Sequence, residues 1–276
     1  MSRLMIGVLA LSAAPVLAEP SLERGTYLVE GPAACGNCHT PLGPDGPMME
    51  MSLGGRVVED SAAFTAIADN ITPGGAVADW TDEEFVRAIR EGIRPDGSVI
   101  GPPMPIALYR GLSDDDVMSM VLYLRGVPAV DNDPGESTYN IPLPPAYGPP
   151  IESVAHPEDG VTEAYGAYLA GPVAHCLECH TTMGEMGPMF DTHLGAGGLE
   201  FHGPWGVSVA SNITPSGDGI AGYSDEELAA MITQGVRPDG GPMYPPMPYA
   251  NFARMTEDDL AAVILYLRSM PPLPDP

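Results

Sequence analysis

One pentapeptide pattern, C-x-x-C-H, occurs twice in this chain, at residues 35–39 (CGNCH) and 176–180 (CLECH). The two copies use all four cysteines of the sequence and lie 141 residues apart. Two thiols at this spacing can each bind one vinyl group of a haem, and the adjacent histidine can then take an axial position on the iron. The pattern therefore predicts two covalently attached haem c groups, held by Cys35, Cys38, His39, Cys176, Cys179 and His180.

Other uses of such cysteines are a redox dithiol, a structural zinc site or a pair of disulfides. A dithiol of the thioredoxin type does not need the histidine and belongs in a βαβ pattern that this sequence does not show. Zinc requires four ligands in one place, and two motifs so far apart do not force a shared site. Haem attachment accounts best for a motif that occurs twice and includes every cysteine.

Residues 1–18 predict export. They contain Arg3, a run of small and apolar residues, and the sequence Val-Leu-Ala immediately before Glu19, which is typical of a secretory signal peptide cleaved after Ala18. No later stretch approaches the length of a membrane span, so we expect no integral membrane segment in the mature chain. Because c-type haem is attached outside the cytoplasmic membrane in bacteria, we expect a periplasmic protein.

The sequence is strongly acidic, with 37 Asp and Glu against 11 Lys and Arg and a formal net charge of −26. This charge excludes general nucleic-acid binding and predicts repulsion from anionic membrane surfaces. We expect partners that present basic patches, as electron carriers often use. An acidic surface that serves solubility or a salty habitat is the alternative interpretation.

The haem motif is part of a longer internal repeat, whose offset drifts only from 141 to 143 residues. The repeated segments are GTYLV (25–29) and GAYLA (166–170), NITP (70–73 and 212–215), WTDEE (80–84) and YSDEE (223–227), GIRPDG (92–97) and GVRPDG (235–240), PMP (103–105 and 246–248), and LYLR (122–125 and 265–268). We therefore expect two copies of one domain, at residues 19–131 and 151–276. Between them, residues 132–150 contain six prolines and predict an extended linker.

Helix caps place the predicted helices of each copy. Thr81-x-x-Glu84 and Ser224-x-x-Glu227 have the capping-box form, and the apolar spacing that follows predicts helices ending at Gly92 and Gly235. Last helices should open at Ser113 and Thr256, and a first helix should run into each haem motif. Three helices, one haem and long Pro- and Gly-rich loops predict an all-α cytochrome c-like domain, present twice.

Met104 and Met247 are the candidates for the second axial ligand of each iron. Both lie in a Pro-Met-Pro sequence between the middle and last helices, and the flanking prolines restrict the loop and help hold a weak thioether ligand. Met243 has no counterpart methionine in the first copy. His193 and His202 occur only in the second copy and are most simply surface or core residues. Ligation by His and Met closes both faces of an iron, which then transfers electrons but binds no substrate.

Two other repeated features are predicted to surround the haems. The NITP segments offer amide and hydroxyl groups that can hydrogen-bond a haem propionate or hold the loop around its edge. Arg94 and Arg237 are predicted partners for a propionate carboxylate in a chain with so few cations. Both features are equally well explained as turn structure.

The repeated series resembles the cytochrome c subunits of bacterial periplasmic alcohol, aldehyde and gluconate dehydrogenases, over nearly the whole mature chain. The resemblance implies His and Met ligation in each domain, at His39 with Met104 and at His180 with Met247. It also implies that electrons pass from a catalytic subunit to quinone or to another cytochrome. This chain differs in having two haem motifs where the best-known members have three, and in lacking a C-terminal membrane helix, which argues against direct reduction of quinone.

These features together predict an exported dihaem cytochrome c that relays electrons and has no substrate chemistry of its own. The expected donor is the catalytic subunit of a periplasmic dehydrogenase, and the expected acceptor is another cytochrome or a terminal oxidase. The alternative is a dihaem enzyme of the peroxidase or thiosulfate-oxidising type, with one open or labile haem iron. The near-identity of the two methionine loops argues against that asymmetry.

Overall fold

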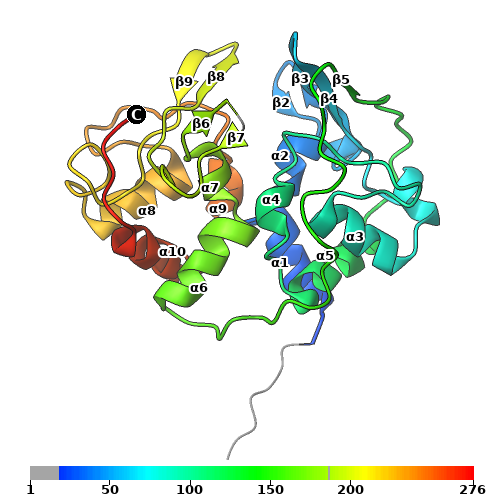
Figure 1. Cartoon of the computed structure of the whole chain (residues 1–276), viewed down its shortest axis with the longest axis horizontal. Coiled ribbons are helices and arrows are strands. Elements are labelled where there is room, and N and C mark those ends of the chain that lie inside the picture. Colours follow the sequence, from blue (N-terminus) through cyan, green and yellow to red (C-terminus); the bar gives the residue numbers. More distant parts are fainter. Residues whose placement is uncertain (1–18, 186) are drawn as a thin grey trace, which may run out of the picture.

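A computed structural model describes residues 19–185 and 187–276, so the predicted signal peptide lies outside the described residues. We call residues 19–131 the first half, 132–150 the connecting segment and 151–276 the second half. Figure 1 shows the two halves side by side, with the connecting segment running along the first half. The helices occur in the same order in both halves.

The first half contains five helices, two 3₁₀ turns and four strands, and the connecting segment adds one strand. In chain order these are α1 (Leu22–Glu30), α2 (Cys35–His39), β1 (Leu42–Gly43), β2 (Gly46–Pro47), η1 (Met49–Met51), β3 (Arg56–Asp60), β4 (Phe64–Ala68), η2 (Ala76–Asp79), α3 (Asp82–Glu91), α4 (Ile106–Tyr109), α5 (Asp114–Gly126) and β5 (Thr138–Tyr139).

The second half repeats the order of helices and of paired strands, but its described residues have no counterparts of η1, η2 and β5, and a π turn, η3, is added after α6. Its elements are α6 (Glu163–Tyr168), η3 (Leu169–Val173), α7 (Cys176–Cys179), β6 (Met183–Gly184), β7 (Gly187–Pro188), β8 (Glu200–Gly203), β9 (Gly206–Val209), α8 (Asp225–Gln234), α9 (Tyr249–Phe252) and α10 (Glu257–Ser269).

The caps predicted for the middle helices are confirmed. Thr81 and Glu84 form a reciprocal capping box at the start of α3, and α3 ends at Gly92, whose φ of 67° lies in the left-handed region that favours glycine. The corresponding box and glycine begin and end α8 in the same way. Ser113 and Thr256 cap the last helices, α5 and α10, as predicted.

Each half is built on a close helix crossing. α1 packs against α5, and α6 packs against α10. A Cβ atom at Gly25 would collide with the backbone carbonyl of Ser119, and one at Gly166 would collide with that of Ala262. Glycine therefore lets the two helix backbones approach each other in both halves.

The prediction of an all-α fold is wrong. The described residues also form four small antiparallel sheets, β1–β2, β3–β4–β5, β6–β7 and β8–β9. The longer hairpins fall in stretches that the sequence analysis treated as loops. A folded chain must still satisfy the backbone N–H and C=O groups of such stretches, and antiparallel pairing does so here. The molecule is therefore a mixed structure in which the helices surround the haem motifs and the hairpins extend beyond them.

The first helix of each half does not run into the haem motif as predicted. α1 ends at Glu30 and α2 begins at Cys35, while a π turn with Pro172 separates α6 from α7. The residue before each motif, Ala34 or His175, has a φ of 48° or 41°. This left-handed residue reorients the chain, so that each motif forms a separate short helix. Among the described residues, no helix combines the length and apolar character needed to span a membrane.

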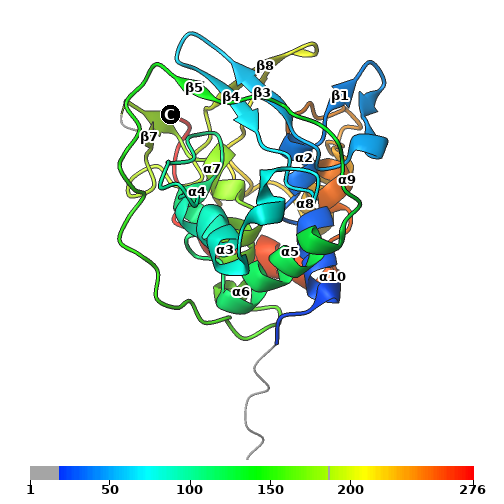
Figure 2. The ribbon, with the colours of Figure 1, turned by 90° about the vertical axis from the view of Figure 1, so that its right-hand side faces the viewer.

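The two halves are related by an approximate twofold arrangement at their boundary. The hydroxyl of Tyr27 donates a hydrogen bond to Asp259 of the second half, and the hydroxyl of Tyr168 donates one to Asp116 of the first half. Tyr27 corresponds to Tyr168 in the repeat, and Asp116 corresponds to Asp259. The buried apolar core is continuous across this boundary. Figure 2 shows the molecule from the side, with α1, α5, α6 and α10 at the same end.

Candidate haem-binding sites

The four motif cysteines form no disulfide with one another. Burial raises the pKa of Cys35, Cys176 and Cys179 to about 12, and it also raises the pKa of Cys38. A catalytic dithiol needs at least one thiol with a lowered pKa. These sites therefore lack the electrostatics of a redox dithiol, and their thiols remain neutral.

Both motif histidines are held in the same orientation. The Nδ1–H of His39 donates to the backbone carbonyl of Asp69 at 2.7 Å, and that of His180 donates to the carbonyl of Ser211 at 2.6 Å. A carbonyl only accepts hydrogen bonds, so Nδ1 carries the proton and Nε2 keeps a free lone pair. Burial lowers the pKa of both imidazoles. Each histidine is thus a neutral donor that offers Nε2 to a metal, with its second nitrogen held as in typical metal sites.

In the second half, predicted site residues come together around one cavity. Cys176, His180 and Met247 line it together, whereas Met243 does not belong to its lining. Every other lining residue is apolar: Ala174, Ile213, Ile232, Phe252, Met255, Val263 and Leu267. An apolar enclosure with a histidine and a methionine in its wall fits a haem, which supplies a large apolar ring and an iron with two axial positions.

The counterparts of these residues in the first half pack against one another. Cys35 and Met104 are partly buried against the central core cluster, and so is Ile71. The buried members of this set are Ala33, Ile89, Tyr109, Leu112, Met120 and Leu124. The first half therefore has a similar, largely apolar set of side chains around its motif.

The two candidate methionines occupy the same backbone position in their halves. Each follows two prolines joined by a cis peptide bond, Pro102–Pro103 or Pro245–Pro246. Each precedes a short helix that the sequence analysis missed, α4 or α9. Both methionine side chains are half-buried. The repeat thus gives Met104 and Met247 equivalent local environments.

The NITP segments hold the chain that follows the last helix of each half. The Asn70 amide donates to the carbonyls of Val130 and Asn132, and its oxygen accepts hydrogen bonds from Thr72. Asn212 makes the equivalent bonds to Leu273 and Thr214. Of the two roles considered for these segments, the structure supports loop fixation, since the polar groups of Asn70 are already used.

Arg94 and Arg237 differ, although they occupy equivalent positions. Arg94 forms an ion pair with Asp69 at 2.8 Å, next to the carbonyl that holds His39. Ser211 replaces Asp69 in the second half, and Arg237 forms no ion pair with a described residue. The two sites therefore have different charges near the motif histidine.

The two motifs lie next to each other at the boundary. The Nε2–H of His175 donates to the carbonyl of Ala33 at 3.3 Å, and the Asn37 amide donates to the carbonyl of Pro246 at 3.3 Å. The His175 ring also meets the Tyr109 ring edge-on, with centroids 5.8 Å apart. Glu178 lies within the second motif, and burial raises its pKa to about 7. These contacts bring the residues just before and inside both motifs together.

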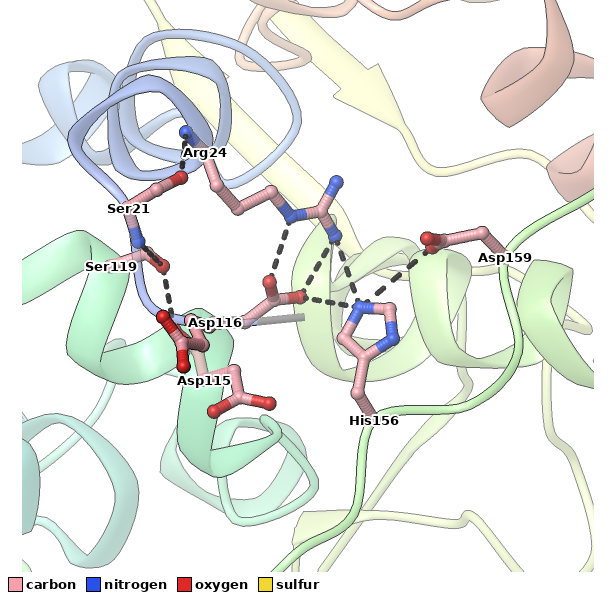
Figure 3. A pocket seen from close by; sticks show the side chains of 8 residues that line it. Ser21, Arg24, Asp115, Asp116, Ser119, His156 and Asp159 are labelled. Atoms are coloured by element: carbon pink, nitrogen blue, oxygen red, sulfur yellow. Dashed lines mark hydrogen bonds and ion pairs between the residues drawn. The ribbon is translucent and has the colours of Figure 1, made fainter. Parts of the chain in front are cut away.

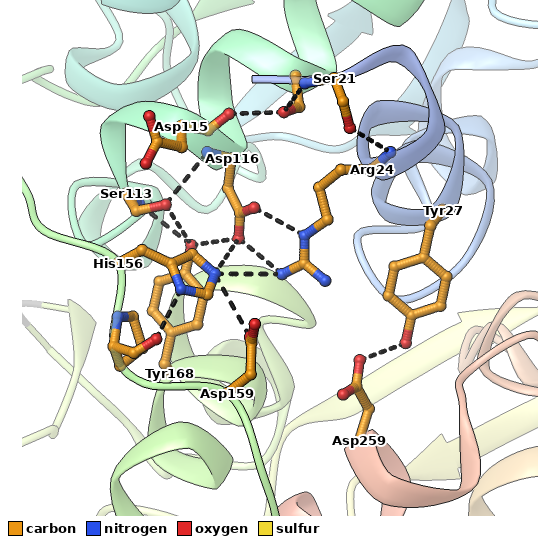
Figure 4. A network of polar contacts seen from close by, with 12 residues as sticks. Ser21, Arg24, Tyr27, Ser113, Asp115, Asp116, His156, Asp159, Tyr168 and Asp259 are labelled. Atoms are coloured by element: carbon orange, nitrogen blue, oxygen red, sulfur yellow. Dashed lines mark hydrogen bonds and ion pairs between the residues drawn. The ribbon is translucent and has the colours of Figure 1, made fainter. Parts of the chain in front are cut away.

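A second polar site at the boundary was not predicted from sequence. The carboxylate of Asp116 accepts hydrogen bonds from Arg24 at 2.7 and 2.9 Å and from Tyr168 at 2.6 Å, and His156 lies 3.4 Å from it. Figure 3 shows Arg24, Asp116 and His156 around a small pocket, and Figure 4 shows the wider network with Tyr168, Tyr27 and Asp259. The sequence did contain one signal for this site, namely the internal repeat, in which Tyr27 recurs as Tyr168 and Asp116 recurs as Asp259.

The remaining histidines of the second half lie elsewhere. His202 is exposed beside Glu200, and His193 contacts Thr192. Neither lines the cavity that contains His180 and Met247. Within residues 19–185 and 187–276, no group of three or more His, Cys, Asp or Glu side chains is arranged to hold a metal ion.

Comparison with known proteins identifies related chains. Residues 164–271 match the cytochrome c family, whose domains carry covalently bound haem c. The chain is 30% identical to the fructose dehydrogenase cytochrome subunit of Gluconobacter japonicus over 91% of its own length and 53% of that protein. It is 29% identical to the cytochrome c subunit of the quinone alcohol dehydrogenase of Gluconobacter oxydans, over 98% of this chain and 60% of that subunit.

A relative of similar size carries two haems by name. The chain is 26% identical to a diheme cytochrome c-type protein of Cereibacter sphaeroides, over 86% of this chain and 82% of that protein. By contrast, the chain spans a little over half the length of the dehydrogenase subunits that it matches.

Proposed function

We propose that this chain is a dihaem electron carrier that accepts electrons from a dehydrogenase. The match of residues 164–271 to the cytochrome c family supports this proposal, as does the similarity of most of the chain to the cytochrome c subunits of fructose and alcohol dehydrogenases. One haem c would be attached to Cys35 and Cys38, and the other to Cys176 and Cys179. Haem iron supplies the redox chemistry by cycling between Fe(III) and Fe(II). The residues of the two motifs and the methionine loops would hold the haem, provide the ligands of its iron and exclude water from it.

We assign His39 and Met104 to the first iron, and His180 and Met247 to the second. The observation that carries this assignment is the cavity in which Cys176, His180 and Met247 meet among apolar side chains. The Nδ1 hydrogen bonds of His39 and His180 support it, because they leave Nε2 of each imidazole free. The equivalent backbone position of Met104 extends the assignment to the first half.

The relay between the two halves is supported by the contact between their haem motifs. His175 precedes the second motif and hydrogen-bonds the chain just before the first, while Asn37 inside the first motif reaches the loop of Met247. Haems attached to these motifs would lie on the two sides of one boundary. An electron could therefore pass between them without leaving the protein.

We place the protein in the periplasm, with the catalytic subunit of a dehydrogenase as donor. The names of the relatives support a dehydrogenase as donor, and the signal peptide predicted from sequence supports export. We propose another cytochrome or a terminal oxidase as the acceptor of these electrons.

The visible spectrum of the reduced protein with and without carbon monoxide tests the proposal, together with the covalent haem content of the same sample. We expect two haems per chain and no spectral change, because a thioether and an imidazole close each iron. Rapid carbon monoxide binding to the unaltered protein would instead indicate an open iron and an enzyme of the peroxidase or thiosulfate-oxidising type.

Replacement of each methionine tests the individual ligands. Met104→Ala and Met247→Ala should each keep two covalent haems but make one of them bind carbon monoxide. Met243→Ala is the matched control, since Met243 lies in the same loop region but does not line the cavity. A spectrum that stays six-coordinate in Met247→Ala, or one that opens in Met243→Ala, would overturn the assignment.

A further inference from the structure

The two halves differ in how their longer hairpins are covered. In the first half, β5 of the connecting segment pairs with the outer edge of β4, and Ser137 bonds both backbone groups of Ile67. The ring of Tyr139 lies against Gly101, and its hydroxyl donates to the carbonyl of Pro102 at 2.9 Å. The connecting segment thus covers the surface formed by β4 and the start of the Met104 loop.

The equivalent surface of the second half is open. β9 corresponds to β4, and no strand pairs with its outer edge in the part of the chain that the structure describes. Val207 is 54% exposed and Val209 is 55% exposed, whereas their counterparts Thr65 and Ile67 are half-buried. Away from the hairpin, Val236 is 39% exposed, whereas its counterpart, Ile93, is only 6% exposed.

This open surface adjoins both candidate ligands of the second iron. Ser208, between the two exposed valines, donates a 2.6 Å hydrogen bond to the carbonyl of Pro245, two residues before Met247. The carbonyl of Ser211, just after β9, holds His180. Because side chains alternate along a strand, Val207 and Val209 point away from the face that Ser208 presents to the methionine loop. Tyr244, 53% exposed, lies next to Pro245 on that loop, so exposed apolar side chains occur both on β9 and on the loop that β9 contacts.

We propose that the surface formed by Val207, Val209 and Tyr244 is the docking face through which the second half exchanges electrons with a basic redox protein. The inference rests on the proposed function, because it presumes a haem behind this surface. An open apolar edge of this kind is unusual in a protein that stays unpartnered, and the first half shows the same edge buried under its own chain. Electrons from the haem of the covered first half would then reach that partner through the haem of the second half.

The charge of the chain defines the partner. A formal net charge of −26 attracts a positively charged protein over long range and orients its approach. The exposed valines and the tyrosine then provide the apolar centre of a transient contact, which in such complexes is surrounded by a polar rim. A second copy of this chain carries the same negative charge and is disfavoured on the same grounds.

The test uses the full-length holoprotein and a mitochondrial-type cytochrome c, a basic mono-haem protein, as probe. The second-order rate constant for oxidation of the reduced protein by this probe would be measured by stopped flow at low and physiological ionic strength. We expect the rate to fall as salt increases. Val207→Lys combined with Val209→Lys should lower the low-salt rate about tenfold, which corresponds to about 1.4 kcal/mol.

Val57→Lys is the matched control for location, because Val57 is a 48% exposed valine on the hairpin of the first half. The control variant combines Val57→Lys with Leu122→Lys, a second exposed position. It therefore adds the same two positive charges as the Val207→Lys and Val209→Lys double variant. We expect this control pair to change the rate less than about twofold. A control that slows the reaction as much as the double variant, or a double variant that matches the unaltered rate, would overturn the proposal.

Two further readouts separate the explanations. A concentration-dependent dimer of the unaltered protein that the valine double variant abolishes would assign the surface to a second copy instead. Carbon monoxide binding by the unaltered protein would overturn the electron-carrier function itself. If neither haem of the unaltered protein binds carbon monoxide and the valine double variant is oxidised at the unaltered rate, only the docking face is overturned and the electron-carrier function stands. Haem content of all variants must equal that of the unaltered protein for the rates to be compared.

Discussion

The hydroxyl of Tyr168 donates a 2.6 Å hydrogen bond to the carboxylate of Asp116, and this bond connects α6 of the second half to α5 of the first. Burial and the carboxylate raise the pKa of Tyr168, so the hydroxyl stays protonated and continues to donate. Tyr27 and Asp259 make the same bond with the halves exchanged, at 2.5 Å. Two equivalent pairs thus fix the position of the two haem motifs relative to each other.

Removing the hydroxyl of Tyr168 should destabilise the protein. Tyr168→Phe leaves the buried Asp116 without one of its donors, and bonds to charged groups are worth about 1.5–3 kcal/mol each. Denaturant unfolding of the full-length protein would measure this as a decrease in the free energy of unfolding. Tyr244→Phe is the control, because Tyr244 is exposed, and it should change the free energy by less than about 0.5 kcal/mol. Equal effects of both variants would refute the role of this bond.

His156 should make the protein less stable as the pH rises above about 6.5. A hydrogen bond to Asp116 is the main cause that raises its pKa above 6.5, so the folded protein favours the protonated imidazole. Its contribution to stability is fully present below about pH 6.5 and is lost as the pH rises through the raised value. The groups that face its ring are Arg24, Asp116, Asp159, Tyr165 and Tyr168.

The measurement compares the unaltered protein with His156→Gln across pH 5.5 to 8.5. The difference in free energy of unfolding between them should be constant at the acid end and should shrink as the pH rises. Each unit by which the pKa is raised corresponds to about 1.4 kcal/mol. Asp116 acts in the opposite direction, since its lowered pKa contributes stability that is lost only in acid. A difference that does not change with pH would contradict the assignment.

Alanine in place of glycine at either helix crossing should lower the free energy of unfolding. At Gly25 or Gly166 the new Cβ would meet a backbone carbonyl of the partner helix, which cannot move aside as a side chain can. We expect Gly25→Ala and Gly166→Ala to lower the free energy of unfolding by roughly 1–3 kcal/mol. Gly126→Ala, in the last turn of α5, meets no atom within 4 Å and should be neutral or slightly stabilising. Thermal unfolding of the three variants would distinguish these outcomes.

On the proposed assignment, loss of Arg94 should change the potential of the first haem and not that of the second. Arg94→Gln leaves the charge of Asp69 uncompensated beside the carbonyl that holds His39, which favours Fe(III) and lowers the potential of the first haem. A shift on the order of 20–60 mV is expected, equivalent to about 0.5–1.4 kcal/mol for one electron. Asp69→Asn should reverse this shift when it is combined with Arg94→Gln. Redox titration followed by the visible spectrum measures both potentials, and a second-haem potential that shifts equally would contradict the prediction.

Local signals in the sequence predicted the middle and last helices of each half. The capping boxes at Thr81 and Ser224 and the terminal glycines Gly92 and Gly235 are where the structure has them, because a cap depends on residues within one helical turn. The haem motifs and the methionine ligands are predictions that rest on spacing and on the internal repeat. The hairpins were missed because strand pairing joins residues through backbone groups that leave a weaker pattern in sequence.

Asp116 shows the limit of that reasoning. Its spacing from Ser113 marks the start of a helix, and Ser113 does cap the backbone N–H of Asp116. Its carboxylate, however, does not return to the cap but binds Arg24 of its own half and Tyr168 of the other half. A partner 52 residues away depends on how the two halves pack, which no local pattern records.

The sequence by itself determined the two haem motifs, the repeat that duplicates their surroundings and the helices that flank them, since all of these depend on residues near one another in the chain. Only the tertiary structure decided that the two motifs meet at one boundary, that histidine Nδ1 is held by a backbone carbonyl, and that β5 covers β4 while β9 stays open. These features arise from contacts between distant segments, and burial and backbone pairing select them only when the whole chain is folded.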